Sequence, residues 1–296
     1  MNSRALYGAI EAGGTKVVCA AGYGPLQIPD DCREVIPTTT PEITLGAVVA
    51  FFERIRREGG ALAGIGVAAF GPVDVDRQSP TWGSILATPK PGWSGVSLTK
   101  PLQHFGPVAI DTDVNAAALA EARYGAGIGV DSVVYVTVGT GIGGGVVVGG
   151  CTIRGMLHPE MGHIRVRRDP RDEAFAGICP FHGDCLEGLA SGPAIVARWN
   201  AKLDELAAAH PAHQIIGGYL GQLAATIVLM LSAQRIVFGG GVMHEWLLPH
   251  IRAAAARELG GYLPVDARCG GFDRLIVPPA LADRAGITGA MLLAAG

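Results

Sequence analysis

The hydrophobic pattern near the start of the chain predicts a β-hairpin. An apolar run at residues 6–10 breaks at the sequence Glu-Ala-Gly-Gly-Thr-Lys and resumes over residues 17–21. A second copy of this pattern begins at residue 132, breaks at residues 139–145 and resumes over residues 146–148. Short apolar runs on both sides of a glycine cluster are typical of two strands joined by a turn. Because this pattern of strand, glycine turn and strand occurs twice, we predict two related α/β domains. Their glycine turns would present backbone N–H groups to a common cleft.

Between and after the two hairpins, the pattern alternates helices with buried strands. Apolar residues at helical spacing, among them Leu45, Val48 and Phe52, predict a helix over residues 41–59. Further helices are expected at residues 115–123 and 281–293, and buried strands at residues 65–70, 108–110 and 235–238. Such alternation indicates an α/β fold with parallel strands, in which ligands bind beyond the carboxyl ends of the strands.

The stretch of residues 214–234 carries no charge and is nearly long enough to span a bilayer. Gln222, Thr226 and Ser232 interrupt it, however, and its fully apolar part, residues 227–231, is far too short to cross one. No aromatic belt or basic flank frames the stretch. We therefore predict a buried helix in a soluble core.

Composition favours an intracellular enzyme. A length of 296 residues accommodates two domains of ordinary size, and the 49% of hydrophobic residues supply their cores. The formal charge of −3 gives no electrostatic footprint for nucleic acid or an anionic membrane. The first residues form no long apolar segment that would direct export, so we expect a cytoplasmic protein. The 44 glycines are clustered, which marks places where the backbone approaches a ligand such as a phosphate.

Two histidines and two cysteines have the spacing of a metal site. His163 is followed by Cys179, His182 and Cys185, a set that suits a tetrahedral zinc ion. Because all four positions would be filled by the protein, the zinc would be structural, unless His163 has a second duty. A disulfide between the two cysteines remains an alternative, as does a chance grouping of core residues. A Rieske cluster needs a pairing of Cys and His that the lone His163 does not provide.

A carboxylate and a third glycine turn also follow predicted strands. Asp113 stands at a junction between a strand and a helix, where open α/β sheets bind ligands. Asp is also common as a helix N-cap, and the two roles can coexist. Residues 239–241 form the third turn, directly after a buried strand. Residues 84–93 predict a rigid loop that either packs or contacts a ligand.

Four motifs occur in order along the chain. They are an acidic-x-Gly-Gly-Thr-Lys turn at residues 11–16, an Asp-x-Asn-Ala-Ala-Ala-Leu run at 113–119, a Glu-x-Gly-His element with a Cys-rich loop at 160–187, and Gly-Gly-Gly at 239–241. Together they resemble the ROK family of sugar kinases, and within it the bacterial fructokinases, over essentially the whole chain. The resemblance implies an actin-like duplicated two-domain α/β fold with an interdomain cleft. We expect a smaller domain of residues 1–112 plus 283–296 and a larger one of residues 113–282.

The resemblance also implies an ATP-dependent hexose kinase that uses Mg²⁺ and contains a structural Zn²⁺. Asp113 would be the catalytic base, Thr112, Glu160, His163 and Glu187 would bind the sugar, and Glu11 would be an outer-sphere carboxylate for Mg²⁺. The nucleotide would contact residues of the three turns and Pro193. These residues are Gly13, Gly14, Thr15, Lys16, Gly139, Thr140, Gly141, Pro193, Gly239, Gly240, Gly241 and Met243.

Two departures from the family pattern indicate fructose as the substrate. Many family members have Asp where this chain has Glu11 and Asn where it has Thr112, and both differences resemble the fructokinase branch. Alternatives within the family are a glucokinase, a mannokinase or an N-acetylhexosamine kinase. Sugar-sensing repressors of the family add a DNA-binding domain for which the chain has no room before its first strand. A catalytically silent sugar-binding module is a further alternative, and a homodimer would fit the resemblance.

Overall fold

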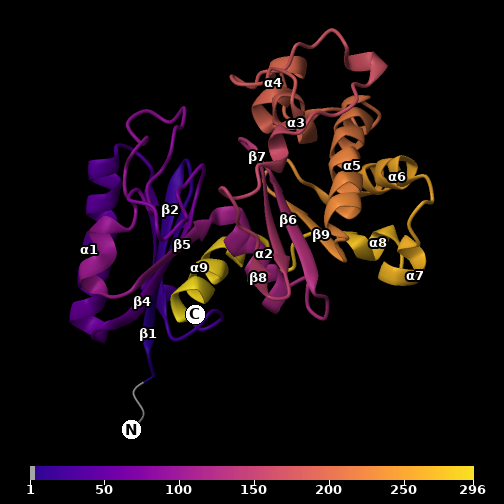
Figure 1. Cartoon of the computed structure of the whole chain (residues 1–296). Helices are drawn as coiled ribbons and strands as arrows, with labels where there is room; N and C mark the ends of the chain where they lie inside the picture. The colour runs from indigo at the N-terminus through magenta and orange to yellow at the C-terminus, as the bar shows by residue number, and fades with distance from the viewer. Residues whose placement is uncertain (1–3) are drawn as a thin grey trace. The chain divides into compact units, whose positions relative to one another are not determined.

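In a computed structural model, which describes residues 4–296, the chain forms two compact units (Figure 1). The first comprises residues 4–120, 153–158 and 283–296, and the second comprises residues 121–152 and 159–282. The expected division placed residues 113–120 and 153–158 in the larger domain. They lie in the first unit because Ala116 packs in the core cluster of Ala9 and Met291, while Arg154 forms an ion pair with Asp111.

The first unit contains a mixed five-stranded sheet in the order β3-β2-β1-β4-β5. Strands β1 and β2 form the predicted antiparallel hairpin, while β4 joins β1 and β5 joins β4 in parallel. The strands are β1 (Leu6–Ala12), β2 (Lys16–Gly22), β3 (Arg33–Pro37), β4 (Leu62–Ala69) and β5 (Val108–Thr112). The sequence thus placed the first hairpin and both parallel strands, with β4 starting earlier than expected.

Helices α1 (Pro41–Gly59) and α9 (Ala285–Ala295) cover opposite faces of this sheet. Successive residues of β1 point to different faces, so Ile10 packs with Phe52 of α1 while Ala9 packs with Met291 of α9. Thr40 caps the start of α1 by accepting a hydrogen bond from the N–H of Ile43. The helix α9 lies very close to the sheet, because a Cβ atom at Gly66 would come within 1.9 Å of the Ala290 carbonyl oxygen.

The second unit repeats the design in a sheet of order β10-β9-β6-β7-β8. Strands β6 and β7 form the second antiparallel hairpin, and β9 pairs with β6 in parallel as β4 pairs with β1. The strands are β6 (Ser132–Val138), β7 (Ile142–Val148), β8 (Cys151–Thr152), β9 (Arg235–Gly239) and β10 (Ile276–Val277). The duplication predicted from the two glycine turns is therefore present in the topology.

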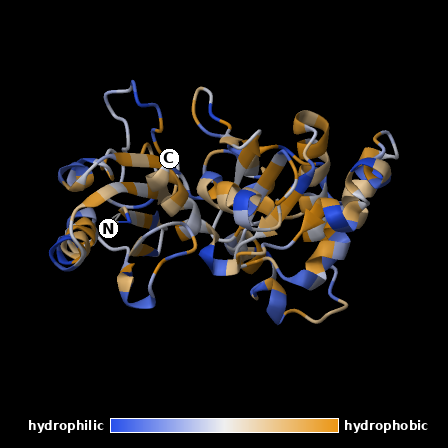
Figure 2. Ribbon diagram, turned by 90° about the horizontal axis from the view of Figure 1, so that it is seen from below, coloured by the Kyte–Doolittle hydropathy of each residue, from blue (hydrophilic) through white to orange (hydrophobic). Residues whose placement is uncertain are grey.

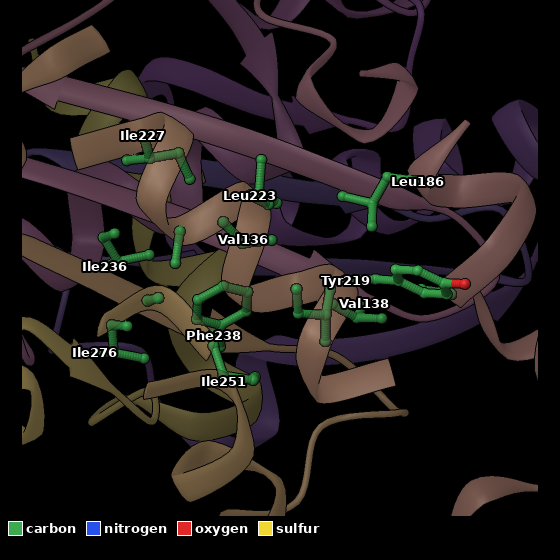
Figure 3. Close-up of a cluster of buried hydrophobic side chains, with 14 of the residues drawn as sticks. Val136, Val138, Leu186, Tyr219, Leu223, Ile227, Ile236, Phe238, Ile251 and Ile276 are labelled. Atoms are coloured by element: carbon green, nitrogen blue, oxygen red, sulfur yellow. The ribbon is translucent and has the colours of Figure 1, made fainter. Parts of the chain in front are cut away.

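The apolar stretch near residue 220 forms α5 (Ala212–Leu231), the central helix of the second unit. By length and composition it qualifies as a membrane span, but 61% of its most apolar window is buried. It packs on α6 (Leu248–Leu259) so closely that a Cβ atom at Gly221 would lie 2.3 Å from that of Ala254. Figure 3 shows Phe238 of β9 and Ile251 of α6 in the core that α5 covers.

Shorter helices complete both units. The helix α2 (Asp113–Tyr124) follows β5 directly, and α3 (Leu186–Ala190) and α4 (Gly192–Trp199) follow the segment of the predicted metal ligands. The helices α7 (Val265–Cys269) and α8 (Phe272–Leu275) precede β10. In Figure 2 single helices carry both orange and blue residues, as expected when one face packs on a core and the other meets water.

Candidate functional site

The first glycine turn joins β1 to β2 and presents backbone donors to solvent. The N–H of Gly13 bonds to the carbonyl of Lys16 at 2.9 Å, and the Thr38 hydroxyl donates to the carbonyl of Gly13 at 2.8 Å. Gly14 and Thr15 are exposed, and within residues 4–296 their N–H groups have no hydrogen-bond acceptor. Inward carbonyls and outward N–H groups are the arrangement that binds a phosphate.

The second glycine turn joins β6 to β7 and lies at the start of α4. The N–H of Gly139 bonds to the carbonyl of Gly141 at 2.9 Å, and the N–H of Gly192 bonds to the carbonyl of Gly139 at 2.8 Å. Pro193 follows Gly192 in the first turn of α4, so the structure brings it to the second turn. Thr140, at the tip of the turn, is exposed.

The third glycine turn, after β9, lies beside the second. A Cβ atom at Gly139 would be 3.9 Å from the N–H nitrogen of Gly241. Gly240 has a φ of 98°, which favours glycine, and its carbonyl accepts a hydrogen bond from the N–H of Met243 at 3.0 Å. The predicted nucleotide residues of the second unit therefore form one group of adjacent backbone turns.

Asp113 is the first residue of α2, and its neighbour supplies the helix cap. The hydroxyl of Thr112 accepts a hydrogen bond from the N–H of Asn115 at 3.1 Å, which is the N-cap interaction. Asp113 is half-buried and accepts from the N–H of Val114 at 2.8 Å. Thr112 is only 2% exposed. The capping role that Asp113 was expected to share therefore belongs to Thr112.

The strand end before Asp113 is fixed by a buried carboxylate. Asp111 is fully buried and accepts from the Asn115 side chain at 2.9 Å and from the N–H of Thr112 at 2.8 Å. The second carboxylate oxygen of Asp111, Oδ2, accepts hydrogen bonds from the guanidinium of Arg154, at 2.8 Å from Nη2 and 3.2 Å from Nε. A buried charge with this many partners sets the backbone rigidly, so the position of Asp113 is strongly determined.

Glu11, near the end of β1, lies at the N-terminus of α9. Its carboxylate lies against Gly286, where a Cβ atom would come within 2.4 Å of the Glu11 carboxyl carbon. The same carboxylate accepts a hydrogen bond from the backbone N–H of Ile287. Burial raises the pKa of Glu11 above its ordinary value, and Lys16 opposes the rise. A carboxylate in this place interacts favourably with the helix dipole.

Of the four expected sugar ligands, Glu160, His163 and Glu187 lie in the second unit, whereas Thr112 lies in the first. Glu160 precedes a short 3₁₀ helix (Met161–His163) and is exposed, whereas His163 is half-buried. Glu187 lies in the first turn of α3, and its Oε2 accepts a hydrogen bond from the N–H of Ile142 at 2.8 Å. The backbone of the second hairpin therefore holds the Glu187 carboxylate in place.

The predicted metal residues form one cluster. His163, Cys179, His182 and Cys185 each offer one ligand atom, and these four atoms all lie within 4.8 Å of one another. Cys179 Sγ is 3.8 Å from His163 Nδ1 and 3.6 Å from His182 Nδ1, and Cys185 Sγ is 3.5 Å from His163 Nδ1. The cysteines are free thiols, so the disulfide alternative is not what the structure shows.

These distances fit a tetrahedral zinc ion. Bonds of about 2.3 Å to sulfur and 2.0–2.1 Å to nitrogen separate the two ligand atoms by about 3.6 Å in a tetrahedron. The three sulfur-to-nitrogen distances of 3.5, 3.6 and 3.8 Å agree with that value. The four donors would close the coordination sphere, and each histidine would keep its Nε2 away from the metal.

Sequence reasoning missed an ion pair that anchors the metal-binding segment. Asp172 and Arg198 are 4% and 6% exposed and lie 3.1 Å apart, and the Tyr219 hydroxyl donates to Asp172 at 2.6 Å. Burial lowers the pKa of Arg198 and raises the pKa of Tyr219. The pair joins the segment before Cys179 to α4 and α5. In the sequence, the signal for this ion pair is a single arginine, Arg198, within the otherwise largely apolar helix α4.

Comparison with known proteins identifies relatives along the whole chain. The profile of the ROK family matches residues 7–296. The chain is 46% identical to a fructokinase of Zymomonas mobilis in an alignment 303 positions long, which covers 99% of this chain and 97% of the relative. It is 42% identical to a putative fructokinase of Bacillus subtilis, with 98% and 95% of the two chains covered.

The fold is also similar to solved structures. One is the crystal structure of a ROK family glucokinase from Streptomyces griseus in complex with glucose and AMPPNP. The TM-score is 0.74 at 26% sequence identity, and the alignment covers 98% of this chain and 99% of that chain. The similarity therefore extends over both units.

Proposed function

The chain belongs to the ROK family and has its actin-like duplicated α/β fold, and on this premise we propose that it is an ATP-dependent fructokinase. It transfers the γ-phosphoryl group of ATP to a hydroxyl of D-fructose and yields fructose 6-phosphate. The observation that carries the proposal is the near full-length identity of 46% to a fructokinase. All three glycine turns and Asp113 are retained, which supports a catalyst over a silent sugar-binding module.

Backbone donors hold the nucleotide in this proposal. The N–H groups of Gly14 and Thr15 bind phosphate oxygens at the first turn, and Gly139, Thr140 and Gly141 do so at the second. The group of Gly239, Gly240, Gly241, Met243 and Pro193 binds the nucleoside part. Mg²⁺ is held mainly by the phosphate oxygens. Because Glu11 is engaged by the N–H of Ile287 and has a raised pKa, an outer-sphere position suits it better than direct coordination.

Asp113 accepts the proton of the sugar hydroxyl as the phosphoryl group is transferred. Phosphoryl transfer needs an acceptor that is in line with the leaving oxygen, neutralised phosphate charge and a proton acceptor. Asp111, Asn115 and Thr112 fix the backbone on both sides of Asp113. Asp113 thus needs little reorganisation to orient the hydroxyl. Thr112 is too buried to make a broad contact with the sugar, so it acts chiefly by capping α2 and placing Asp113.

Glu160, His163 and Glu187 orient the sugar hydroxyls. Zn²⁺ would be bound through His163 Nδ1, Cys179, His182 and Cys185, and its role there is to hold the loop that precedes Glu187. The imidazole of His163 then has its Nε2 available for a sugar hydroxyl. The protein is expected to act in the cytoplasm as a homodimer.

A coupled assay of ADP release across sugars tests the proposal. We expect turnover with fructose and ATP, and a value of kcat/KM for glucose, mannose and N-acetylated hexosamines that is lower by at least about tenfold. If glucose were phosphorylated in preference to fructose, glucose would be assigned as the substrate, and the kinase assignment would stay intact. No ADP release with any hexose would reject the kinase assignment and favour a sugar-binding module.

A further inference from the structure

A lysine outside the recognised motifs contacts the first glycine turn. Lys90 lies between Pro89 and Pro91, and its Nζ donates a hydrogen bond to the carbonyl oxygen of Gly14, 76 positions earlier in the chain. The contact places an ammonium group beside the exposed N–H groups of Gly14 and Thr15. Both partners belong to the first unit.

The loop around Lys90 is built to hold this position. Trp93 is 1% exposed, its indole N–H donates to the carbonyl of Thr39 at 2.9 Å, and its backbone N–H donates to the carbonyl of Lys90 at 3.3 Å. The neighbouring Thr38 holds the carbonyl of Gly13. The two adjacent threonines therefore attach both the Lys90 loop and the glycine turn to one segment of chain, which keeps the ammonium group next to the turn.

The charge of Lys90 has no carboxylate partner among residues 4–296. Lys16, the lysine of the recognised motif, instead interacts electrostatically with Glu11. Its positive charge lowers the pKa of Glu11 and so opposes the effect of burial. An ammonium group has three donors, and the Gly14 carbonyl takes one of them. Two donors and an unneutralised charge thus remain at a turn whose N–H groups point to solvent.

We propose that Lys90 is a phosphate-binding residue of the nucleotide site. When ATP binds, the ammonium group contacts the terminal phosphate that Gly14 and Thr15 receive, and it neutralises charge on that phosphate during transfer. The inference rests on the proposed kinase function and adds a cation that the family motifs do not contain. The competing explanation is that Lys90 only supports the turn through the Gly14 carbonyl.

Calorimetric titration of Lys90→Met with AMPPNP and with ADP separates the two explanations. A contact to the terminal phosphate predicts that AMPPNP binding weakens at least about tenfold while ADP binding changes less than about twofold. Lys90→Arg should recover most of the AMPPNP affinity because it restores the charge. Equal weakening for both nucleotides, or no weakening for either, would overturn the proposal.

Lys100→Met is the matched control, because Lys100 is an exposed lysine of the same unit whose side chain makes no hydrogen bond or ion pair within residues 4–296. It should bind both nucleotides as the wild-type protein does. Thermal unfolding of each variant checks that the turn is intact. The titrations contain no sugar, so a protein that discriminates AMPPNP from ADP through Lys90 but phosphorylates no hexose would refute only the fructokinase proposal.

Discussion

Glu187 accepts a hydrogen bond from the backbone N–H of Ile142 at 2.8 Å, which joins the start of α3 to the second glycine turn. The carboxylate fills the space beside Gly141, where a Cβ atom would lie only 2.6 Å from its Oε2. A residue expected to bind sugar thus also stabilises a turn expected to bind phosphate. Changes at Glu187 should therefore affect both substrates unless the hydrogen bond is preserved.

Two substitutions at Glu187 separate these duties. Glu187→Gln keeps an oxygen that can accept from Ile142 but loses the charge, so KM for fructose should rise at least about tenfold with KM for ATP nearly unchanged. Glu187→Ala also removes the acceptor, so KM for ATP should rise as well. Steady-state kinetics with each substrate varied in turn measures both values. Identical effects of the two variants would contradict the dual role.

Purified protein should contain about one zinc ion per chain. The four ligand atoms fit a tetrahedron, so the metal should bind tightly and help to fold the segment between His163 and Cys185. Metal analysis measures the content, and Cys185→Ser should lower both the zinc content and the melting temperature. A metal-free protein with full activity and unchanged melting temperature would refute a structural zinc, and Cys151→Ser, at an exposed free cysteine, is the control.

Asp113→Asn should lower kcat by at least about 10²-fold with little change in nucleotide affinity. The amide keeps the size of the side chain and an acceptor for the N–H of Val114, but it cannot take up the proton of the sugar hydroxyl. Rapid mixing or a sensitive ADP assay measures the residual rate. Near-normal turnover would exclude Asp113 as the base.

Local patterns were sufficient to predict the hairpins and the helix α1. Glycines interrupt apolar runs at both hairpin turns, and Thr40-Pro41 and Gly60 mark the ends of α1. The strand β4 begins at Leu62, before the predicted start at residue 65, because Gly64 interrupts the apolar pattern, and Gly66 follows inside the strand. Those glycines are required by the close approach of α9, which no local pattern reveals.

The candidate site likewise has features that the sequence predicts and features that it does not. The metal cluster was predictable because the spacing of His163, Cys179, His182 and Cys185 determines which donors can share one ion. The contacts from Lys90 to Gly14 and from Arg154 to Asp111 were not, because they join residues far apart in the sequence. The boundary of the units was also missed in part, since the first turns of α2 pack on the first sheet.

The pKa of Glu11 predicts a stability difference that depends on pH. Burial raises the folded-state pKa above the unfolded value, so the folded state takes up a proton more readily. At a pH below the pKa that Glu11 has in the unfolded chain, burying Glu11 therefore costs no folding free energy through its charge. As the pH rises through the higher pKa of the folded state, the buried carboxylate becomes charged and lowers the free energy of unfolding. Glu11→Gln keeps an acceptor for Ile287 and should melt above the wild-type protein at pH 7, with the difference vanishing at about pH 4.

Differential scanning calorimetry of both proteins across this range measures the effect. Glu42→Gln, at an exposed first-turn position of α1, is the control and should not melt above the wild-type protein at pH 7, because that position favours a negative charge. A Glu11→Gln protein that is less stable than wild type at pH 7 would show that the interaction with the α9 dipole outweighs the cost of burial.

Sugar preference should depend on whether the residue that caps α2, Thr112 in this chain, carries a side-chain amide. Thr112 is 2% exposed and its hydroxyl accepts from the N–H of Asn115, so a replacement must preserve that hydrogen bond. Asn is as good an N-cap as Thr and adds an amide that both donates and accepts. Thr112→Asn should therefore fold normally and narrow the preference for fructose over glucose, since an unpaired buried polar group costs about 1–3 kcal/mol.

Values of kcat/KM for the two sugars measure this preference, and wild-type protein should favour fructose by at least about tenfold. Thr112→Ser keeps the hydroxyl that caps α2 and should keep the wild-type ratio, which separates the effect of the amide from that of any loosening of the helix. If Thr112→Asn and Thr112→Ser gave the same ratio as wild type, Thr112 would have no part in the choice of sugar. The discrimination would then rest with Glu160, His163 and Glu187, whose positions depend on the metal cluster and the turn at Ile142.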